Sequence, residues 1–509
     1  MPKDITRVAL ALCLSLAVGA PLAAQAPAPA SPEPPAPEFA FALSGFYEIN
    51  GYSQSNFFLG RGASGFVSDK DRYAIQLFRV QPEFSYGPSL KAVMRIDMAQ
   101  GIWGVDDELR DNDRPGYNNL FNNKDTNFHV HLDWAYLEAS PSRLDGWGFR
   151  AGRMKNQLGN LLVLDQDGDG VQVFKRFGPW RLLLDWTKLS EGVDGLTDDV
   201  FPGGLDGRDA DLFYVDLARP LGKGQINPFL AHYRDGNRQT SYVPQRLEYF
   251  RARFTPNLSE AWVLGTAFQA TAGRLALKGE ATYLTGKDRI PNANSGPNQL
   301  LDVNDGDLRG HNVYLDARLG LGRHGTLGLV CGRGSGDDDP TSGRGNINKI
   351  RTNGFFYVTE VWEDSIMPDE EGITPQGLGS PAHRGYRELE NTTLVQLNYA
   401  RPLGRDWKLF VAGTLLRATE ALRPWRDANG NGAIEAAEFG AARSKDLGWE
   451  LDAKADWTLM KNLTWTFRGG VFSPGAASGY LLNGTDQFLD NAWELRTTLA
   501  FNFATPAKK

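Results

Sequence analysis

Residues 427–438 carry the residue types of a calcium-binding loop at the spacing that such a loop requires. An EF-hand loop takes oxygen ligands from positions 1, 3, 5, 7, 9 and 12 and turns sharply at a glycine in position 6. Gly432 occupies that sixth position. The ligand positions hold Asp427, Asn429, Asn431, Ala433 (through its carbonyl), Glu435 and Glu438. The sequence therefore predicts a structural calcium ion here; the alternative is a Gly/Asn-rich surface loop that matches by chance.

A second acidic segment, residues 165–170, begins like such a loop but does not end like one. Its carboxylates are Asp165, Asp167 and Asp169. The twelfth position is Arg176, so the bidentate carboxylate is missing. Calcium is the weaker hypothesis for this segment, because another loop would have to donate the missing oxygen. A plain acidic outer loop is the favoured interpretation.

Residues suited to catalysis are sparse. His129 and His131 alternate with Asp133, a spacing that suits a metal ion, but polar residues of a wet interior are the favoured interpretation. The chain has six histidines and no Gly-x-Ser-x-Gly nucleophile elbow. We therefore expect that the protein is not an enzyme.

The amino terminus predicts export from the cytoplasm. Lys3 and Arg7 precede an apolar run, residues 8–18, that ends among small residues, as in a cleaved secretory signal peptide. We assign residues 1–26 to that peptide. Residues 27–38 are mostly Pro, Ala, Ser and Glu, which predicts an extended periplasmic spacer or a disordered leader.

Composition narrows the class of the mature chain. Beyond the leader, no apolar run reaches the ~18 residues of a membrane-spanning helix, so the chain is soluble or a barrel. The 57 glycines, the 11% aromatic content and the net charge of -7 fit a barrel. Cys331 is the one cysteine after the leader and can form no internal disulfide. The acidic balance argues against nucleic acid as a partner.

The final strand gives the clearest indication of fold. Within residues 493–503, one face would carry Trp493, Leu495, Leu499, Phe501 and Phe503. The other face would carry Glu494, Arg496, Thr498 and Asn502. A barrel wall between lipid and water needs this alternation. The sequence therefore predicts an all-β, transmembrane antiparallel barrel over residues 39–503, with a tail at residues 504–509.

Short and long connections alternate between the predicted strands. Turn-forming residues mark short connections at residues 87–88, 140–146, 178–179, 220–224, 272–273, 322–325, 402–406 and 460–462. Long polar connections span residues 104–127, 156–170, 191–209, 235–262, 286–310, 334–387, 420–445 and 473–490. This pattern predicts about eighteen strands, with short periplasmic turns and long extracellular loops. Sixteen strands are the alternative. Residues 246–254 also have strand character. They are assigned to a loop because this preserves the alternation of short and long connections.

The same alternation assigns charged side chains to the interior. The predicted pore-lining residues are Arg79, Lys91, Arg95, Asp97, Arg153, Arg181, Asp185, Lys278, Arg318, Lys454, Arg468 and Arg496. Further inner carboxylates are Glu83, Glu280, Asp316, Glu450, Asp452, Asp456 and Glu494. The two signs nearly balance, so the count alone does not indicate a polyanionic solute.

The second and third hairpins contain several distinctive motifs, at residues 133–138 (Asp-Trp-Ala-Tyr-Leu-Glu), 149–155 (Phe-Arg-Ala-Gly-Arg-Met-Lys), 159 (Gly), 169–173 (Asp-Gly-Val-Gln-Val) and 180–185 (Trp-Arg-Leu-Leu-Leu-Asp). Together these motifs resemble the alginate-export porin family of outer-membrane channels. The resemblance implies eighteen strands and export of an anionic polysaccharide through an arginine-rich constriction, to which Arg153 would belong. Arg150 and Arg153 would face opposite sides unless Gly152 forms a bulge. Phosphate-selective porins share a similar strand and are the rival within this class.

The leading functional prediction is a porin-like channel embedded in outer-membrane lipid that passes hydrophilic solutes by passive diffusion. Polysaccharide export, with periplasmic export partners, is the variant that the resemblance implies. The alternative from another class is a calcium-stabilised surface adhesin or binding protein, for which the barrel is only an anchor.

Overall fold

The computed structural model describes residues 38–61, 70–103, 130–190, 210–235, 260–288, 306–336, 346–347, 356–363, 389, 391–426, 428–429 and 436–505. The chain divides into two units, Met1–Glu38 and Phe39–Lys509, and the fold concerns the second. The predicted signal peptide and almost all of the spacer lie outside the described residues. His129, residues 246–254 and the last four residues of the tail also lie outside them.

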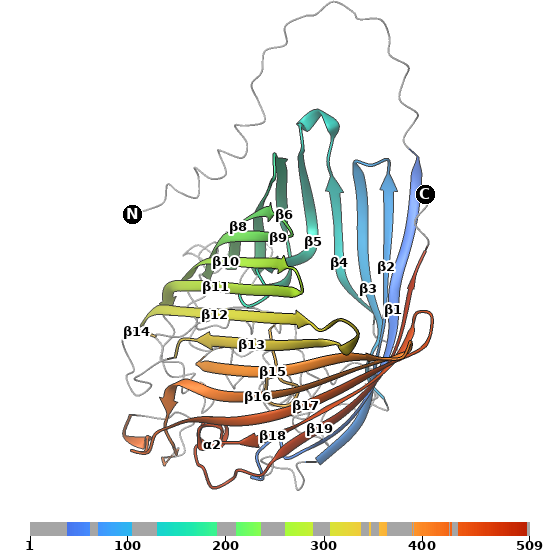
Figure 1. Ribbon diagram of the computed structural model, residues 1–509. Coiled ribbons are helices and arrows are strands. Elements are labelled where there is room, and N and C mark those ends of the chain that lie inside the picture. The colour runs from blue at the N-terminus through green and yellow to red at the C-terminus, as the bar shows by residue number, and fades with distance from the viewer. Residues whose placement is uncertain are drawn as a thin grey trace, which may run out of the picture. The chain divides into compact units, whose positions relative to one another are not determined.

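Eighteen antiparallel strands form one closed barrel, because β1 pairs with both β2 and β19 (Figure 1). The first nine are β1 (Phe39–Ser55), β2 (Lys70–Tyr86), β3 (Leu90–Ile102), β4 (Val130–Ala139), β5 (Trp147–Leu158), β6 (Leu164–Phe177), β7 (Trp180–Ser190), β8 (Ala210–Leu221) and β9 (Gly224–Asp235). The others are β10 (Glu260–Ala272), β11 (Leu275–Asp288), β12 (Gly306–Gly320), β13 (Thr326–Gly334), β15 (Thr392–Leu403), β16 (Trp407–Leu422), β17 (Ser444–Met460), β18 (Leu463–Pro474) and β19 (Ala492–Ala504). The predicted fold and strand number are confirmed.

Three kinds of smaller element accompany the barrel. The two-residue strand β14 (Asn346–Ile347) pairs in parallel with β12. The 3-10 turns are η1 (Ser142–Leu144), η6 (Gly322–His324) and η10 (Ala436–Glu438). Helix α2 (Ala476–Asn483) contacts β16, β17 and β18. In the described part of the chain, no helix combines the length and apolar character needed to cross a membrane.

The short turns lie where turn chemistry predicts them. The sequence Ala-Arg-Pro-Leu-Gly ends both β8 and β15. Its glycine adopts a left-handed backbone in each case, with φ of 58° at Gly222 and 66° at Gly404, which glycine adopts at little steric cost. The predicted long loop at residues 156–170 is wrong, because β5 continues to Leu158 and β6 begins at Leu164.

The outer face of the wall is apolar, as the alternation predicts. On β19, Leu495 and Phe501 are exposed, whereas Glu494 is buried. Trp407, Trp457 and Trp465 stack across three neighbouring strands beside the short turns, with ring centroids 5.2 and 6.3 Å apart. Aromatic rings at strand ends suit the interface between lipid and water. The fold therefore defines an outer-membrane type of wall.

One irregularity reverses the predicted orientation of part of β4. The register between β3 and β4 pairs Ile96 with Leu132 but Arg95 with Trp134, so Asp133 is an extra residue. Such a bulge shifts the alternation by one residue. Simple alternation with Leu132 would place the Trp134 indole on the apolar outer face. It lies instead under the Arg95 guanidinium on the inner side.

Two buried apolar clusters occupy the interior of the barrel. The first joins inner residues of β8–β11 to the connection between β5 and β6 and includes Leu158, Val163, Leu164, Leu212, Ala231, Val263 and Leu284. The second joins β12–β18 to residues 356–363 and α2 and includes Leu162, Val361, Trp362, Leu416, Phe472 and Tyr480. Chain segments from the loop side therefore fold into the barrel and pack against its wall.

Candidate functional site

The hairpin of β5 and β6 leaves the wall and bends into the interior. β4 pairs with β5 only from Ala135–Arg153 to Ala139–Phe149. At the bend, Gly152 lies opposite Gly170. A Cβ on Gly152 would lie 2.3 Å from the Ala135 carbonyl oxygen, and one on Gly170 would lie 2.2 Å from that of Trp186. The bend therefore requires residues without side chains. We call residues 152–170 the inward hairpin.

A polar network and an apolar tip hold one face of the inward hairpin against the wall of β7–β11. Asn156 Nδ2 donates to Thr187 Oγ1 at 3.0 Å, and Gln172 Nε2 donates to Asn156 Oδ1 at 3.0 Å. Gln172 Nε2 also donates to the Tyr214 hydroxyl at 2.9 Å. The tip, residues 159–163, reaches β11, where Asn160 Nδ2 donates to the Gly279 carbonyl at 2.8 Å.

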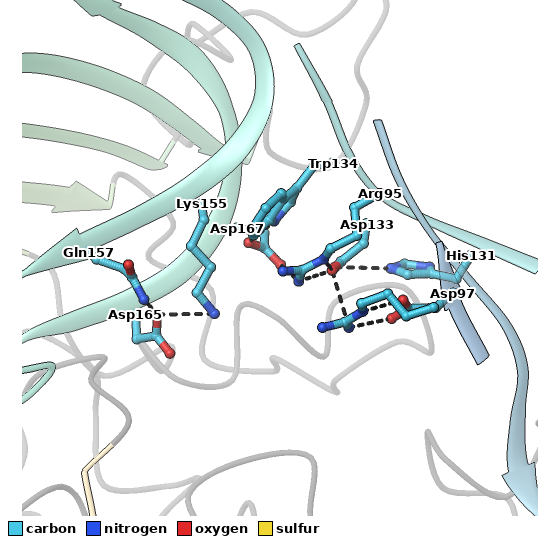
Figure 2. Close-up of polar contacts among 10 residues, drawn as sticks. Arg95, Asp97, His131, Asp133, Trp134, Lys155, Gln157, Asp165 and Asp167 are labelled. Carbon is cyan, nitrogen blue, oxygen red and sulfur yellow. Dashed lines mark hydrogen bonds and ion pairs between the residues drawn. The ribbon is translucent and has the colours of Figure 1, made fainter. Parts of the chain in front are cut away.

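The other face of the inward hairpin carries charged residues toward β3 and β4 (Figure 2). Lys155 Nζ lies 3.0 Å from Asp165 Oδ1, which also accepts from Gln157 Nε2 at 2.9 Å. The Trp134 indole N–H donates to Asp167 Oδ1 at 2.7 Å. Arg95 Nη2 lies 3.9 Å from Asp167 Oδ2. Polar contacts therefore connect the hairpin to the wall of β3 and β4.

The wall itself supplies two arginines that share carboxylates. Arg79 donates from Nε and Nη2 to the two oxygens of Asp97 at 2.5 and 2.6 Å, which is a bidentate pair. Arg79 Nη2 also lies 3.4 Å from Asp133 Oδ2. Arg95 binds Asp133 and stacks its guanidinium 3.5 Å from the centroid of the Trp134 ring. The register brings these residues to one inner patch, which we call the arginine patch (Arg79, Arg95, Asp97, Asp133, Trp134).

A second inward element, residues 356–363, lies against β15–β18. The backbone N–H groups of Val361 and Trp362 donate to the two oxygens of Glu450 at 2.6 and 2.8 Å. The Trp362 ring stacks on Phe472 with centroids 4.8 Å apart. Arg468 Nη1 lies 3.1 Å from Glu360 Oε2. We call residues 356–363 the inner segment.

Burial raises the pKa of Glu363, in the inner segment, to about 7. Its Oε2 accepts from the Val358 and Thr359 N–H groups at 2.8 and 3.2 Å, and these bonds oppose the shift. The nearby charge of Asp452 adds to the increase. Desolvation outweighs the hydrogen bonds because the side chain is buried.

In some ion pairs of the inner face the two partners differ in exposure, whereas in Lys91–Glu83 (39% and 33%) and Arg468–Glu360 (15% and 19%) they are nearly equal. In the Arg79–Asp97 pair the side chains are 24% and 4% exposed. The values are 29% and 6% for Lys155–Asp165, and 62% and 5% for Arg318–Asp316. The Arg153–Asp169 pair is reversed, at 24% and 69%. In the pairs of Arg79, Lys155 and Arg318 the carboxylate is the buried partner, so a solute meets the cation.

The remaining predicted pore-lining residues lie on strands around the barrel. Their contacts are Lys91 with Glu83 (3.1 Å), Arg181 with Asp216 (3.8 Å), Asp185 with Thr187 (2.9 Å), Lys454 with Asp456 (3.5 Å), and Arg496 with Asn50 (3.5 Å). Lys278 is exposed on β11. These contacts are spread over many strands and do not form one cluster with the arginine patch.

At Gly152 and Arg153 the structure follows simple alternation, and the bulge that would bring Arg150 and Arg153 to one side is not formed. The β5–β6 register has no bulge at Gly152, so Arg150 and Arg153 face opposite sides. Arg150 Nε donates to Glu138 Oε2 at 2.5 Å, and Arg153 Nη1 lies 3.5 Å from Asp169 Oδ2. The bend at the glycine, rather than a bulge, carries Arg153 onto the charged face of the inward hairpin.

The second acidic segment is strand, not loop. Asp165, Asp167 and Asp169 lie on β6, and each contacts a basic side chain. His131 Nε2 lies 3.8 Å from Asp133 Oδ1. Within the ranges that the structure describes, no three His, Cys, Asp or Glu side chains come together as a group that could hold a metal ion.

The stronger calcium motif is only partly described. Asp427, Asn431, Ala433 and Glu435 lie outside the described residues. Glu438 Oε1 accepts from the Ala428 N–H at 2.8 Å. Trp425 and Phe439 form an antiparallel bridge on either side of the motif.

Three functional features escape sequence reasoning. The bulge that turns Trp134 inward has no signal in the residue types. The contact of Asn160 with Glu280 joins residues 120 positions apart. The inner segment lies within a long predicted loop, where the apolar run Phe356-Tyr-Val358 and Val361-Trp362 was the available signal.

This architecture is that of a closed β-barrel of the outer-membrane type, with an apolar exterior, a charged interior and inward-folded connections. No protein-family model and no curated protein matches the sequence. Among solved structures, OccAB3 of Acinetobacter baumannii matches with a TM-score of 0.52 and 10% identity, over 91% of this chain and 99% of that one. OpdK of Pseudomonas aeruginosa, solved with vanillate, matches at 0.50 and 12%, over 91% and 99%. OccK9 (OpdG) of the same organism matches at 0.50 and 11%, over 91% and 98%.

These similarities establish the fold and correct the family. The expected kinship with the alginate-export porins is wrong, because the structures that match over the length of the chain are Occ and Opd porins. The matched structures are porins, which are channels without enzymatic activity.

Proposed function

We propose that the protein is an outer-membrane channel that passes small anionic solutes by passive diffusion. The observation that carries this proposal is the unequal exposure of three inner ion pairs: Arg79 and Lys155 are partly exposed and Arg318 is exposed, whereas their carboxylate partners are buried. An accessible charge acts on a passing ion more strongly than one covered by protein. The inner surface therefore attracts anions although its formal charges nearly balance.

The filled parts of the interior suggest where the solute passes. One apolar cluster lies along β8–β11 and the other along β12–β18. We infer that the polar path follows the remaining side, between the inward hairpin and the wall of β1–β4 and β19. The arginine patch and Arg496 lie on that side. Two inward elements also favour a small solute over a polysaccharide.

The comparison with OpdK supports an anionic solute. That porin was solved with vanillate, an aromatic carboxylate. Arg95, stacked on Trp134, pairs a cation with an aromatic ring on the inner face. Arg79, the more exposed arginine of the same patch, offers its guanidinium to the carboxylate of a solute of that kind.

Three acyclic polyhydroxy compounds of similar size test the charge preference. Gluconate is anionic, sorbitol is neutral and N-methylglucamine is cationic. In proteoliposomes that contain the purified barrel, we expect entry in the order gluconate, sorbitol, N-methylglucamine. Liposomes without protein are the control. Equal rates, or fastest entry of N-methylglucamine, would refute the proposal.

We also propose that residues 427–438 bind one structural calcium ion. The residue types at the six ligand positions support it, as does the contact of Glu438 with Ala428, which brings the last carboxylate back to the start of the motif. Calcium should slow proteolysis within this loop relative to EGTA, and Glu438→Gln should remove the difference. Identical cleavage of the unaltered chain in calcium and in EGTA would rule the site out.

A further inference from the structure

The tip of the inward hairpin is attached to the far wall by polar contacts with two consecutive residues of β11. The Asn160 N–H donates to Glu280 Oε2, and Asn160 Nδ2 donates to the Gly279 carbonyl at 2.8 Å. β11 lies five strands beyond β6 in the barrel. The rest of the tip, Leu161, Leu162 and Val163, is apolar. The contacts of Asn160 therefore join the hairpin to a distant part of the wall.

Burial of the Glu280 carboxyl group at this position is energetically unfavourable. Its side chain is 1% exposed, and its Oε1 has no hydrogen-bond partner among the described residues. A buried carboxyl group costs free energy that a threonine or alanine on the same inner face would avoid. Thr282, the next inner residue of β11, has no carboxyl group and avoids this free-energy cost. The acceptor that Glu280 offers to the hairpin tip accounts for its presence.

The hairpin is shaped to receive this carboxylate. Gly159 has a left-handed backbone, with φ of 59°. A Cβ at that position would lie 2.3 Å from Glu280 Oε2. Only glycine lets the backbone approach the carboxylate this closely.

Besides the polar network of Asn156 and the apolar cluster, the hairpin is held at its base and at its tip. At its base, the wall approaches Gly152 and Gly170 closely; at its tip, Glu280 holds Asn160. Lys155 and Asp165, on the charged face, lie between these points. Their distance from the arginine patch depends on both attachments.

We propose that Glu280 is a positioning residue that pins the inward hairpin and thereby sets the width and charge of the solute path. This inference rests on the proposed function, because it gives the hairpin its role in a channel. Glu280 acts through the hairpin and contacts no solute itself.

Single-channel conductance in planar bilayers tests the tether. Glu280→Ala removes the acceptor, which should lower the ratio of pinned to released hairpin by about ten- to hundredfold. We expect larger and noisier conductance and a weaker ion preference. Glu280→Gln keeps an acceptor oxygen and should restore conductance to within about twofold of the unaltered chain. A role in barrel stability alone would change expression or heat-modifiable gel mobility but not conductance.

Thiol labelling gives a second measurement that needs no ion selectivity. Leu162 is fully buried, so Leu162→Cys in a Cys331→Ala background should resist a water-soluble maleimide. The label should enter when Glu280→Ala is added. Gly159→Ala disturbs the same contact from the hairpin side and should act like Glu280→Ala, which covers the case in which Glu280→Ala fails to fold. Thr282→Val, on the same strand and face, is the matched control and should leave labelling unchanged.

Unchanged conductance and labelling in a folded Glu280→Ala or Gly159→Ala barrel would overturn the inference. Equal effects of Glu280→Gln and Glu280→Ala would also overturn it, because the acceptor would then be irrelevant. A lack of anion preference in the unaltered channel would overturn the proposed function alone, since conductance and labelling judge the tether whichever ion is preferred.

Discussion

At the scale of single residues, the Arg79–Asp97 pair explains how a wall of balanced formal charge can present a positive surface. The carboxylate lies deeper and accepts both guanidinium hydrogen bonds, whereas the guanidinium keeps part of its surface free. Pairing does not cancel the field when one partner is nearer the solute. The relevant quantity is accessible charge rather than the number of charged residues.

Substitutions of the two partners should therefore act in opposite directions. Arg79→Gln should lower the anion to cation permeability ratio about two- to fivefold, because one charge a few ångströms from a passing ion is worth about 1 kcal/mol in water-like surroundings. Asp97→Asn should raise that ratio, since it frees Arg79 from its main partner. Reversal potentials of both variants provide the measurement. A fall in the ratio for both would show that the pair acts only by holding the wall together.

At the scale of elements, the inner segment contains a buried carboxyl group, that of Glu363, whose protonation should affect how the segment packs against the wall. The pKa of Glu363 lies near 7 in the folded chain, above the ordinary value of 4.5. A raised pKa means that the folded state holds the proton more tightly, so docking is strongest below about pH 4.5 and weakens as the pH rises through 7. The difference corresponds to about 3 kcal/mol. Glu360, Glu450 and Asp452 add like charge near this site, and Arg468 opposes them.

Thiol accessibility of Val361 measures this docking. In a Cys331→Ala background, Val361→Cys should be protected at pH 5 and increasingly labelled at pH 8.5, after normalisation to the denatured protein at each pH. Glu363→Gln should remain protected at both values, because it cannot ionise. Labelling that is the same at both pH values in the chain that retains Glu363 would contradict the assignment.

The bend of the inward hairpin gives a second prediction at this scale. Gly170→Val places a branched side chain where a Cβ would already lie 2.2 Å from the Trp186 carbonyl. Overpacking of this kind costs about 1–3 kcal/mol or moves the backbone. We expect a lower urea midpoint together with higher conductance. Gly320→Ala, where a Cβ would lie 3.5 Å from the nearest atom, the Arg274 carbonyl oxygen, is a control for the loss of a glycine.

The same elements show what local sequence can and cannot predict. Strands and short turns follow from alternation and from residues such as Gly222 and Gly404, whose effects are local. The orientation of Trp134 depends on one extra residue in the pairing of β3 with β4, which alternation alone does not contain. The inward bend depends on Gly152 and Gly170 being opposite each other, a fact of register. Exposure within each ion pair is likewise a property of the folded wall.

At the scale of the whole barrel, connections fold inward and convert a wide cylinder into a narrower path. Apolar clusters fix the inward hairpin and the inner segment to the wall. The part of the interior that these elements leave open is bordered by the arginine patch, Lys155 and Arg496. We therefore expect the accessible cations on this border to decide which ions cross.

The reversal potential of the unaltered channel under a KCl gradient tests this claim most directly. We expect a reversal potential with the sign that a preference for chloride gives. Its magnitude should fall as the salt concentration rises and screens the charges of the wall. A potential of the sign set by potassium, or none at any salt concentration, would contradict this expectation.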